Sequence, residues 1–236
     1  MSPSHPDADP LPGFTASRAR SLAAEWDDDG LWDDVAWLGG QVWAANDEAD
    51  RAVRWHHLVV AAGNFKRPRA RWLHPDRLAG ISGQHPRIAD SIDTPAGLRV
   101  GRDDPASWES LRSSLVGADV STTASLLAAL WPRDHFVFDW RVRNAASGLR
   151  VAAGLEPCPA VTPAIAGGEA SPLDFTDYTL VRTWLDALEL PLVVSQRALY
   201  CLSKKAGSDL SRPWSQYAQV LLSILENVED RQQNAD

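Results

Sequence analysis

The stretch around Asp139 carries the residue types best suited to chemistry. Asp139 follows the apolar run Phe136 to Phe138 and precedes Trp140 and Arg141. Asp is a favoured N-cap, so this position predicts that Asp139 opens a helix. The positive end of that helix would keep the carboxylate ionised, and the apolar run would hold it against a buried wall. A purely structural cap paired with Arg141 or Arg143 explains the same pattern, and the sequence leaves both interpretations open.

A second candidate feature lies upstream, between Leu115 and Ala124. Gly117 stands in a short turn between two helical segments, and Thr122 and Thr123 lie in the first turn of the second segment. Backbone N–H groups in such a turn, together with the positive end of the following helix, attract phosphate groups. The sequence therefore predicts a helical hairpin that contacts a nucleic-acid backbone through Gly117, Thr122 and Thr123.

Together the two features resemble the core of the helix-hairpin-helix DNA glycosylase superfamily, which has the 8-oxoguanine DNA glycosylase-like fold. The resemblance covers Gly117 to Ala146. The family hairpin has the approximate sequence Leu-Pro-Gly-Val-Gly-x-x-Thr-Ala, and an apolar link ending in Val-Asp follows it. Thr123-Ala124 looks like that Thr-Ala, and Phe138-Asp139 looks like that Val-Asp. The resemblance implies an all-α fold, base excision from DNA, and Asp139 as the catalytic carboxylate.

The chain departs from the family pattern within the hairpin. The turn holds one glycine, Gly117, and Asp119-Val120 stand where a second glycine is expected. Thr122 occupies the position of the lysine nucleophile that some members carry, and threonine cannot form a Schiff base. A cysteine cluster for an iron–sulfur site is also missing from the sequence. The resemblance therefore implies a divergent, monofunctional hydrolase that uses water and no cofactor, in which Asp139 stabilises an oxocarbenium-like transition state.

Excision also requires a place for the extruded base. The bond between sugar and base is unreachable inside a duplex, so the target nucleotide must leave the stack. The chain has eleven tryptophans. Most large aromatic rings belong to a core, but one near the site could stack on a flat ligand. The candidates for base stacking are Trp55, Trp72 and Trp140.

The charge of the chain is unevenly distributed. A net charge of −8 taken alone argues against a nucleic-acid partner, yet residues 51–102 hold ten basic and three acidic side chains. Residues 1–50, by contrast, hold two basic and eleven acidic side chains. DNA is the expected partner, with Arg141 as one phosphate contact and a basic run as the others, Lys66, Arg67, Arg69 and Arg71. A solvated loop without a ligand is the alternative interpretation of that run.

Several other kinds of site find no support in the sequence. Cys158 and Cys201 make no disulfide framework and have no metal-ligand spacing. The adjacent His56 and His57 face different ways on a helix, so we expect no metal site. The N-terminal residues lack the layout of a signal peptide, and no apolar run approaches the roughly 18 residues that span a membrane. We therefore expect a soluble, cytoplasmic protein.

Helical spacing of apolar residues dominates the chain and predicts eight to ten helices with no useful strand pattern. Caps and breakers place helices after Thr15, Asp47, Asp104 and Asp139. The helix after Asp47 is expected to end near Gly63, and the helix after Asp104 near Leu115. Pro68 predicts an extended segment from Phe65 to Trp72. The expected fold is a multi-helix globular fold resembling the glycosylase core.

The expected domain boundaries follow from composition. Residues 1–14 form a disordered tail, residues 15–230 form one all-α domain or two helical lobes with a cleft, and residues 231–236 form a C-terminal tail. Residues 151–172, rich in Pro, Ala and Gly, form a loop or linker. The alternative function is a catalytically inactive helical binding or interaction protein that keeps the glycosylase scaffold, which the net negative charge favours.

Overall fold

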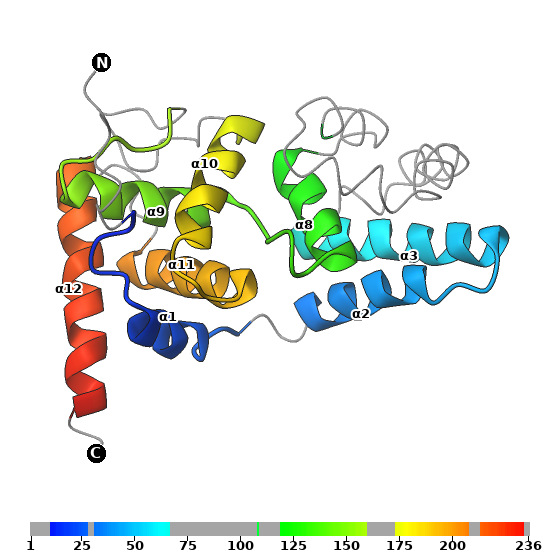
Figure 1. Ribbon diagram of the computed structural model, residues 1–236, viewed down its shortest axis with the longest axis horizontal. Helices are drawn as coiled ribbons and strands as arrows, with labels where there is room; N and C mark the ends of the chain where they lie inside the picture. Colours follow the sequence, from blue (N-terminus) through cyan, green and yellow to red (C-terminus); the bar gives the residue numbers. More distant parts are fainter. Residues whose placement is uncertain are drawn as a thin grey trace. The chain divides into compact units, whose positions relative to one another are not determined.

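Every regular element in the described part of the chain is an α-helix. The computed structural model describes residues 10–27, 31–66, 108, 119–159, 173–207 and 213–233, and none of these residues forms a strand. The all-α fold class predicted from helical spacing is confirmed for this part of the chain (Figure 1). Of the helix expected from Asp104 to Leu115, only Trp108 is described, and it is helical.

The chain divides into two compact units. Unit 1 combines Met1–Trp26 with Asp139–Asp236, and unit 2 is Asp27–Phe138. The sequence predicted one domain over residues 15–230, built as one body or as two helical lobes. The first unit is discontinuous because the chain leaves it after Trp26 and returns to it at Asp139.

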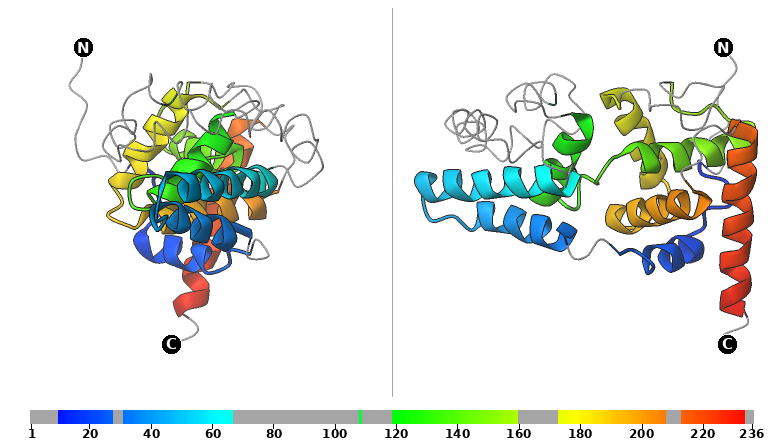
Figure 2. Two further views of the ribbon diagram at one scale, coloured as in Figure 1. Left: turned by 90° about the vertical axis from the view of Figure 1, so that its right-hand side faces the viewer. Right: turned by 180° about the vertical axis from the view of Figure 1, so that it is seen from behind.

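Unit 1 is a packed group of five described helices. They are α1 (Ala16–Ala23), α9 (Trp140–Ala152), α10 (Phe175–Asp186), α11 (Leu192–Ala206) and α12 (Trp214–Gln233). Helix α11 packs against α1, α9 and α12, and α9 packs against α10 and α12 (Figures 1 and 2). The N-terminal segment and the C-terminal half of the sequence therefore share one core.

The ordered part of unit 1 extends into both of the expected tails, residues 1–14 and residues 231–236. Leu11 and Phe14 are buried, with 0% and 1% of their surface exposed. Gly13, at φ +76°, forms a turn between them, a backbone conformation that glycine adopts without strain. The expectation of a disordered tail through residue 14 is wrong from Leu11 onward, because these apolar side chains are anchored in the core of unit 1. At the other end α12 continues to Gln233, beyond the expected boundary at 230.

Unit 2 contains three described helices: α2 (Leu31–Trp43), α3 (Glu48–Lys66) and α8 (Val120–Leu130). Helices α2 and α3 form an antiparallel hairpin, and both pack against α8 (Figures 1 and 2). The indole N–H of Trp43 donates to the carbonyl of Leu130 at 2.9 Å, which joins α2 to the end of α8. All eleven residues of α8 are buried. This helix therefore forms the centre of the unit.

Helix α3 is longer than the sequence indicated. It runs to Lys66, so the expected end at Gly63 and the extended conformation expected for Phe65 and Lys66 are wrong. Proline disfavours helical backbone mainly at the residue immediately before it, which here is Arg67. The helix consequently continues to the residue just before that restricted position.

Two adjacent glycines of α2 offer a sharp test of the packing in unit 2. A Cβ atom on Gly39 would overlap the backbone carbonyl of Ala129 in α8, whereas a Cβ atom on Gly40 would meet nothing within 4 Å. We expect Gly39→Ala to lower the free energy of unfolding by about 1–3 kcal/mol, because backbone atoms cannot give way as a flexible side chain can. We expect Gly40→Ala to raise it by roughly 0.5–1 kcal/mol, because alanine is the better helix former.

Urea denaturation followed by circular dichroism measures both changes. Equal stability of the two variants would contradict the close approach of α2 and α8 at Gly39.

Candidate functional site

Asp139 caps α9, as its position after an apolar run predicted. Its backbone is extended (φ −142°, ψ 177°), and its Oδ1 accepts the N–H of Val142 at 3.0 Å. Phe136, Val137 and Phe138 before it are buried, while Asp139 itself is half-buried. The predicted helix start and buried link are therefore confirmed. The catalytic role of the carboxylate stays a prediction.

Arg141 lies two residues after Asp139 and rests on aromatic rings. Its Cζ is 4.5 Å from the ring centroid of Trp140 and 5.3 Å from that of Tyr200 in α11. The guanidinium makes no hydrogen bond or ion pair with any residue that the structure describes. Of the two arginines, Arg141 and Arg143, that the capping interpretation offered as partners of Asp139, Arg141 does not pair with it. Arg141 instead presents a cation held in place by stacking rather than by a carboxylate.

The ring contacts extend beyond Tyr200. Trp26, at the end of the α1 segment, meets Tyr200 edge-on with ring centroids 4.7 Å apart, and the Cζ of Arg197 is 5.5 Å from the Trp26 ring. All of these side chains are half-buried. We call the set the aromatic–arginine ladder, and its members in spatial order are Trp140, Arg141, Tyr200, Trp26 and Arg197. The last three were not predicted from the sequence, because α1 packs against α11, and α11 against α9, only in the tertiary structure.

A buried ion pair fixes α9 against α10. Arg143 Nη1 lies 3.3 Å from Asp177 Oδ2, and the two side chains are only 2% and 0% exposed. Arg143 also donates from Nε to the Asn144 side-chain oxygen at 3.3 Å, and the N–H of Asp177 donates to Asp174 Oδ1 at 2.7 Å. The helix that Asp139 opens is therefore held in register from its buried side.

The predicted phosphate contacts at the start of α8 are wrong for Thr122 and Thr123. Both side chains are buried, at 1% and 0% exposed. The N–H and hydroxyl of Thr122 donate to Asp119 Oδ1 at 2.8 and 2.9 Å, and the Thr123 hydroxyl donates to the Asp119 carbonyl at 3.0 Å. The Asp119 carboxylate thus occupies the helix end that was expected to attract a phosphate. Gly117 lies outside the described residues.

The remaining predicted site residues lie either on described helices of the two units or outside the described residues. Trp55 of α3 is 2% exposed, so the expectation that it stacks on a base is wrong, because its ring is enclosed in the core of unit 2. Trp140 is half-buried, and its stacking role stays a prediction. Lys66 is the last residue of α3. The other basic residues and the third tryptophan lie outside the described residues: Arg67, Arg69, Arg71 and Trp72.

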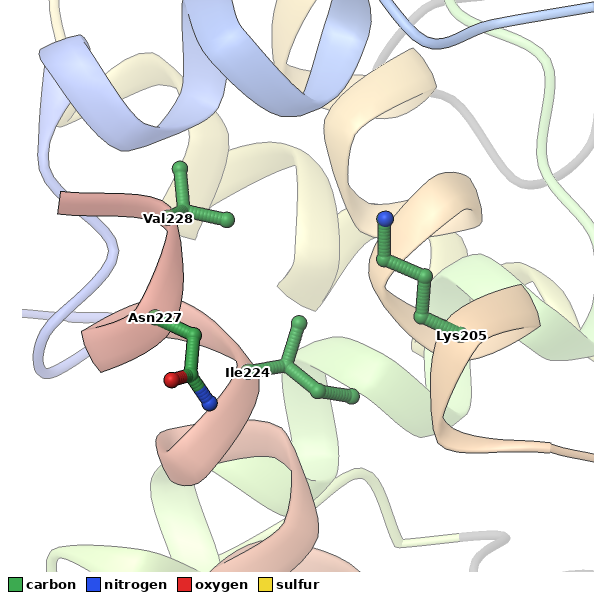
Figure 3. A pocket seen from close by; sticks show the side chains of 4 residues that line it. All are labelled: Lys205, Ile224, Asn227 and Val228. Atoms are coloured by element: carbon green, nitrogen blue, oxygen red, sulfur yellow. The ribbon is translucent and has the colours of Figure 1, made fainter. Parts of the chain in front are cut away.

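A cavity of about 400 Å³ lies between α11 and α12, away from the predicted site residues. It is lined by Lys205 of α11 and by Ile224, Asn227 and Val228 of α12 (Figure 3). The Lys205 ammonium is engaged by Glu25, with Nζ 2.6 Å from Oε2. This lining offers neither a nucleophile nor an available general base, so it is a poor candidate for hydrolytic chemistry.

Comparison of the chain with protein-family models, with curated proteins and with solved structures finds no match. Within the described ranges, no cluster of three or more His, Cys, Asp or Glu side chains has the arrangement of a metal site. None of the described helices combines the length and apolarity that crossing a membrane requires.

Three buried groups predict a loss of stability in alkali. Burial raises the pKa of Cys158 from 9.0 to about 12 and that of Cys201 from 9.0 to about 11. Burial also raises the pKa of Tyr217 from 10.0 to about 12, although the hydrogen bond between the Tyr217 and Ser203 hydroxyls and the nearby Arg141 oppose the rise. Each group binds its proton more tightly in the folded state. Its contribution to stability is therefore complete below the unfolded pKa and is lost as pH rises toward the folded value.

We accordingly expect the free energy of unfolding to fall between about pH 9 and pH 12. Urea denaturation at several pH values measures this slope. Cys158→Ala should make the slope shallower, since one of the three titrating groups is then missing. A parental slope that is flat above pH 9, or equal to that of the variant, would contradict the assignment to Cys158.

Proposed function

We propose that this chain is a glycosylase-like DNA-binding protein that hydrolyses the N-glycosidic bond of a damaged or modified base. Asp139 is the catalytic carboxylate. The observation that carries the proposal is its position: it caps α9 directly after the buried run Phe136 to Phe138, with the half-buried Arg141 two residues away. A carboxylate held in this way suits the stabilisation of positive charge that develops on a deoxyribose ring.

Arg141 supports DNA as the substrate class. Its guanidinium lacks an ion-pair partner among the described residues, and its position is set by the rings of Trp140 and Tyr200. A phosphate oxygen would supply the charge-assisted hydrogen bonds that Arg141 does not make within the described part of the chain. We therefore assign Arg141 to a phosphate next to the target nucleotide.

A base-release assay tests the proposal directly. Duplexes that each carry one base from a panel of damaged and modified bases are incubated with the protein, and abasic sites are then cleaved with alkali. We expect protein-dependent strand breaks at the modified position in at least one duplex. If no duplex in the panel releases its base, hydrolysis is rejected and the protein retains at most a binding function.

The second candidate is a catalytically inactive helical binding or interaction protein that keeps the same scaffold. One observation favours it: Asp119 occupies the N-terminal end of α8, where the resemblance to glycosylases implies a phosphate. The net charge of −8 points the same way. DNA binding without base release would support this candidate, and release of any base would reject it.

The basic run of residues 66–71 gives a separate prediction about DNA binding. Each neutralised phosphate contributes roughly 0.9 to the slope of log affinity against log salt concentration on duplex DNA. Replacing all four cations of the run by Ala should reduce that slope by up to about 3–4, if each of them contacts a phosphate. The substituted residues are Lys66, Arg67, Arg69 and Arg71.

Fluorescence anisotropy of a labelled duplex across a salt series measures the slope. A matched control replaces three exposed cations elsewhere by Ala: Arg20, Arg133 and Lys204. A basic run that makes no phosphate contacts would leave its variant with the parental slope, or with the same slope as the control variant.

A further inference from the structure

We propose that the outer face of α2 is a docking surface for a positively charged helix of a partner protein, with Trp37 as its anchor. The outer face consists of exposed positions on α2 and directly after it: Asp33, Asp34, Trp37, Gly40 and Ala44. All of them except Asp34 recur at intervals of three or four residues, so they share one side of the helix. The inference concerns a partner of unit 2 and goes beyond the proposed action on DNA.

Trp37 is the largest apolar side chain of the outer face. It is 63% exposed, and none of the other described tryptophans is exposed to this degree. It makes no hydrogen bond or ring contact with any residue that the structure describes. Trp32 of the same helix, by contrast, is 6% exposed and packs against Phe65 of α3. The Trp37 indole is therefore accessible to another molecule, and tryptophan is one of the residues that most often dominate the binding energy of an interface.

Gly40 lies one turn after Trp37 and supplies a second, independent observation. Its backbone is helical, and a Cβ atom on it would meet no atom of the described residues within 4 Å. The adjacent Gly39 has an internal reason to be glycine, because a Cβ atom there would overlap the Ala129 carbonyl. Glycine inside a helix destabilises it relative to alanine, and its usual benefit is a close approach of backbone to a neighbour. The packing of unit 2 requires no such approach at Gly40, so we assign the neighbour to a partner.

The shape of the outer face suits a helix. The Trp37 side chain forms a ridge, and the absence of a side chain at Gly40, followed by the small Ala44, leaves a groove beside it. Helices pack by inserting the side-chain ridges of one into the grooves of the other. A partner helix with one apolar stripe can therefore contact the indole and approach the backbone of α2 at Gly40.

Charge selects the partner. Residues 27–50 hold eight acidic side chains and no basic one, and the exposed Asp34 makes no ion pair or hydrogen bond with a described residue. A negative surface repels phosphate, so neither a nucleic acid nor an anionic membrane suits the outer face. A second copy docked through the same face would bring the same acidic residues together across a two-fold axis. A partner with Lys or Arg instead pairs with Asp34 and stacks a cation on the Trp37 indole.

A phage-displayed library of random peptides, selected on the immobilised full chain, tests the chemistry of the partner. Peptides of roughly 16 residues are long enough to form a helix on binding. We expect the enriched peptides to carry a net positive charge and apolar residues at helical spacing. The most enriched peptide is then synthesised with a fluorescent label, and anisotropy measures its affinity for the parent and for each variant. That affinity should fall as salt is added.

Two substitutions on the outer face and one matched control decide the assignment. Trp37→Ala removes the anchor and should weaken peptide binding by at least about tenfold. Gly40→Leu fills the groove and should weaken binding to a similar degree while it melts near the parental temperature, because the added side chain starts in open space. Val53→Ala removes an apolar side chain that is 54% exposed on α3 of the same unit, and it should bind the peptide as the parent does.

The inference is overturned if the enriched peptides are neutral or acidic, if no peptide distinguishes the parent from Trp37→Ala, or if Gly40→Leu binds as Val53→Ala does. A parent dimer in sedimentation that Trp37→Ala dissociates would make a second copy the occupant and reject the cationic partner. Weaker binding of duplex DNA by Trp37→Ala would reject it as well. Failure of the proposed hydrolysis is separate, because base release is measured without the peptide and Trp37→Ala should leave it at the parental level.

Discussion

Asp139→Asn is expected to melt near the parental temperature, to bind DNA as the parent does, and to lose base release. Asn caps a helix about as well as Asp, and its side-chain oxygen can still accept the N–H of Val142. The substitution removes the negative charge that an oxocarbenium-like transition state requires. We expect a fall in the single-turnover rate of at least about 100-fold, in line with the effect of removing one preorganised electrostatic contact in other enzymes.

Asp139→Ala is the matched control for the capping role. It removes the acceptor as well as the charge, so it should lower the free energy of unfolding by about 0.5–2 kcal/mol, the usual cost of losing a cap. If Asp139 acts only as a cap, Asp139→Asn should change activity and stability little, whereas Asp139→Ala should still lower the free energy of unfolding. Parental activity of Asp139→Asn on a substrate that the parent processes would exclude Asp139 as the catalytic carboxylate.

Removing one member of the buried ion pair is expected to have the largest effect on stability. Asp177→Asn leaves the Arg143 guanidinium buried without a full counter-charge, since Arg143 is 2% exposed. Breaking such a pair costs about 3–5 kcal/mol, because the remaining charge has lost both water and its partner. The loss should appear in urea denaturation and as a lower melting temperature. The surface pair of Lys205 and Glu25 is the control, and Lys205→Ala should cost at most about 1 kcal/mol.

A double substitution separates the cost of an unpaired charge from the value of the pair itself. Arg143→Met combined with Asp177→Leu replaces both charges by apolar side chains. Such replacements are often neutral or stabilising, so the double variant should recover much of the stability lost in Asp177→Asn. If Asp177→Asn costs no more than Lys205→Ala, the pair is not the buried electrostatic contact that its geometry indicates.

Local sequence signals were sufficient for the start of α9. A cap preference and an apolar run act over a few residues, so they predicted that Asp139 opens a helix after a buried link. The same kind of signal was available at α8, where Asp119 stands three residues before Thr122 and forms its cap. The resemblance to a phosphate-binding hairpin instead predicted a phosphate at this helix end. The structure follows the capping preference of Asp at this position.

Helical spacing alone determined the fold class, because the period of apolar residues follows from the geometry of a single helix. The accessibility of individual residues did not follow from it. Eleven tryptophans could be counted, yet only packing against α2 and α8 decided that Trp55 is enclosed, while Trp140 stays half-buried. Burial depends on what neighbouring elements cover, and spacing within one helix does not encode it.

The sequence by itself thus determined an all-helical chain with Asp139 at a helix start and a cation two residues later. Only the tertiary structure decided which partners these groups meet. Arg141 contacts Tyr200 of α11 rather than Asp139, and Arg143, close by in sequence, is buried against Asp177 of α10. The two arginines look alike in sequence because their chemistry is the same. Their environments differ because residues on one helix turn toward different neighbours, and those neighbours come from distant parts of the chain.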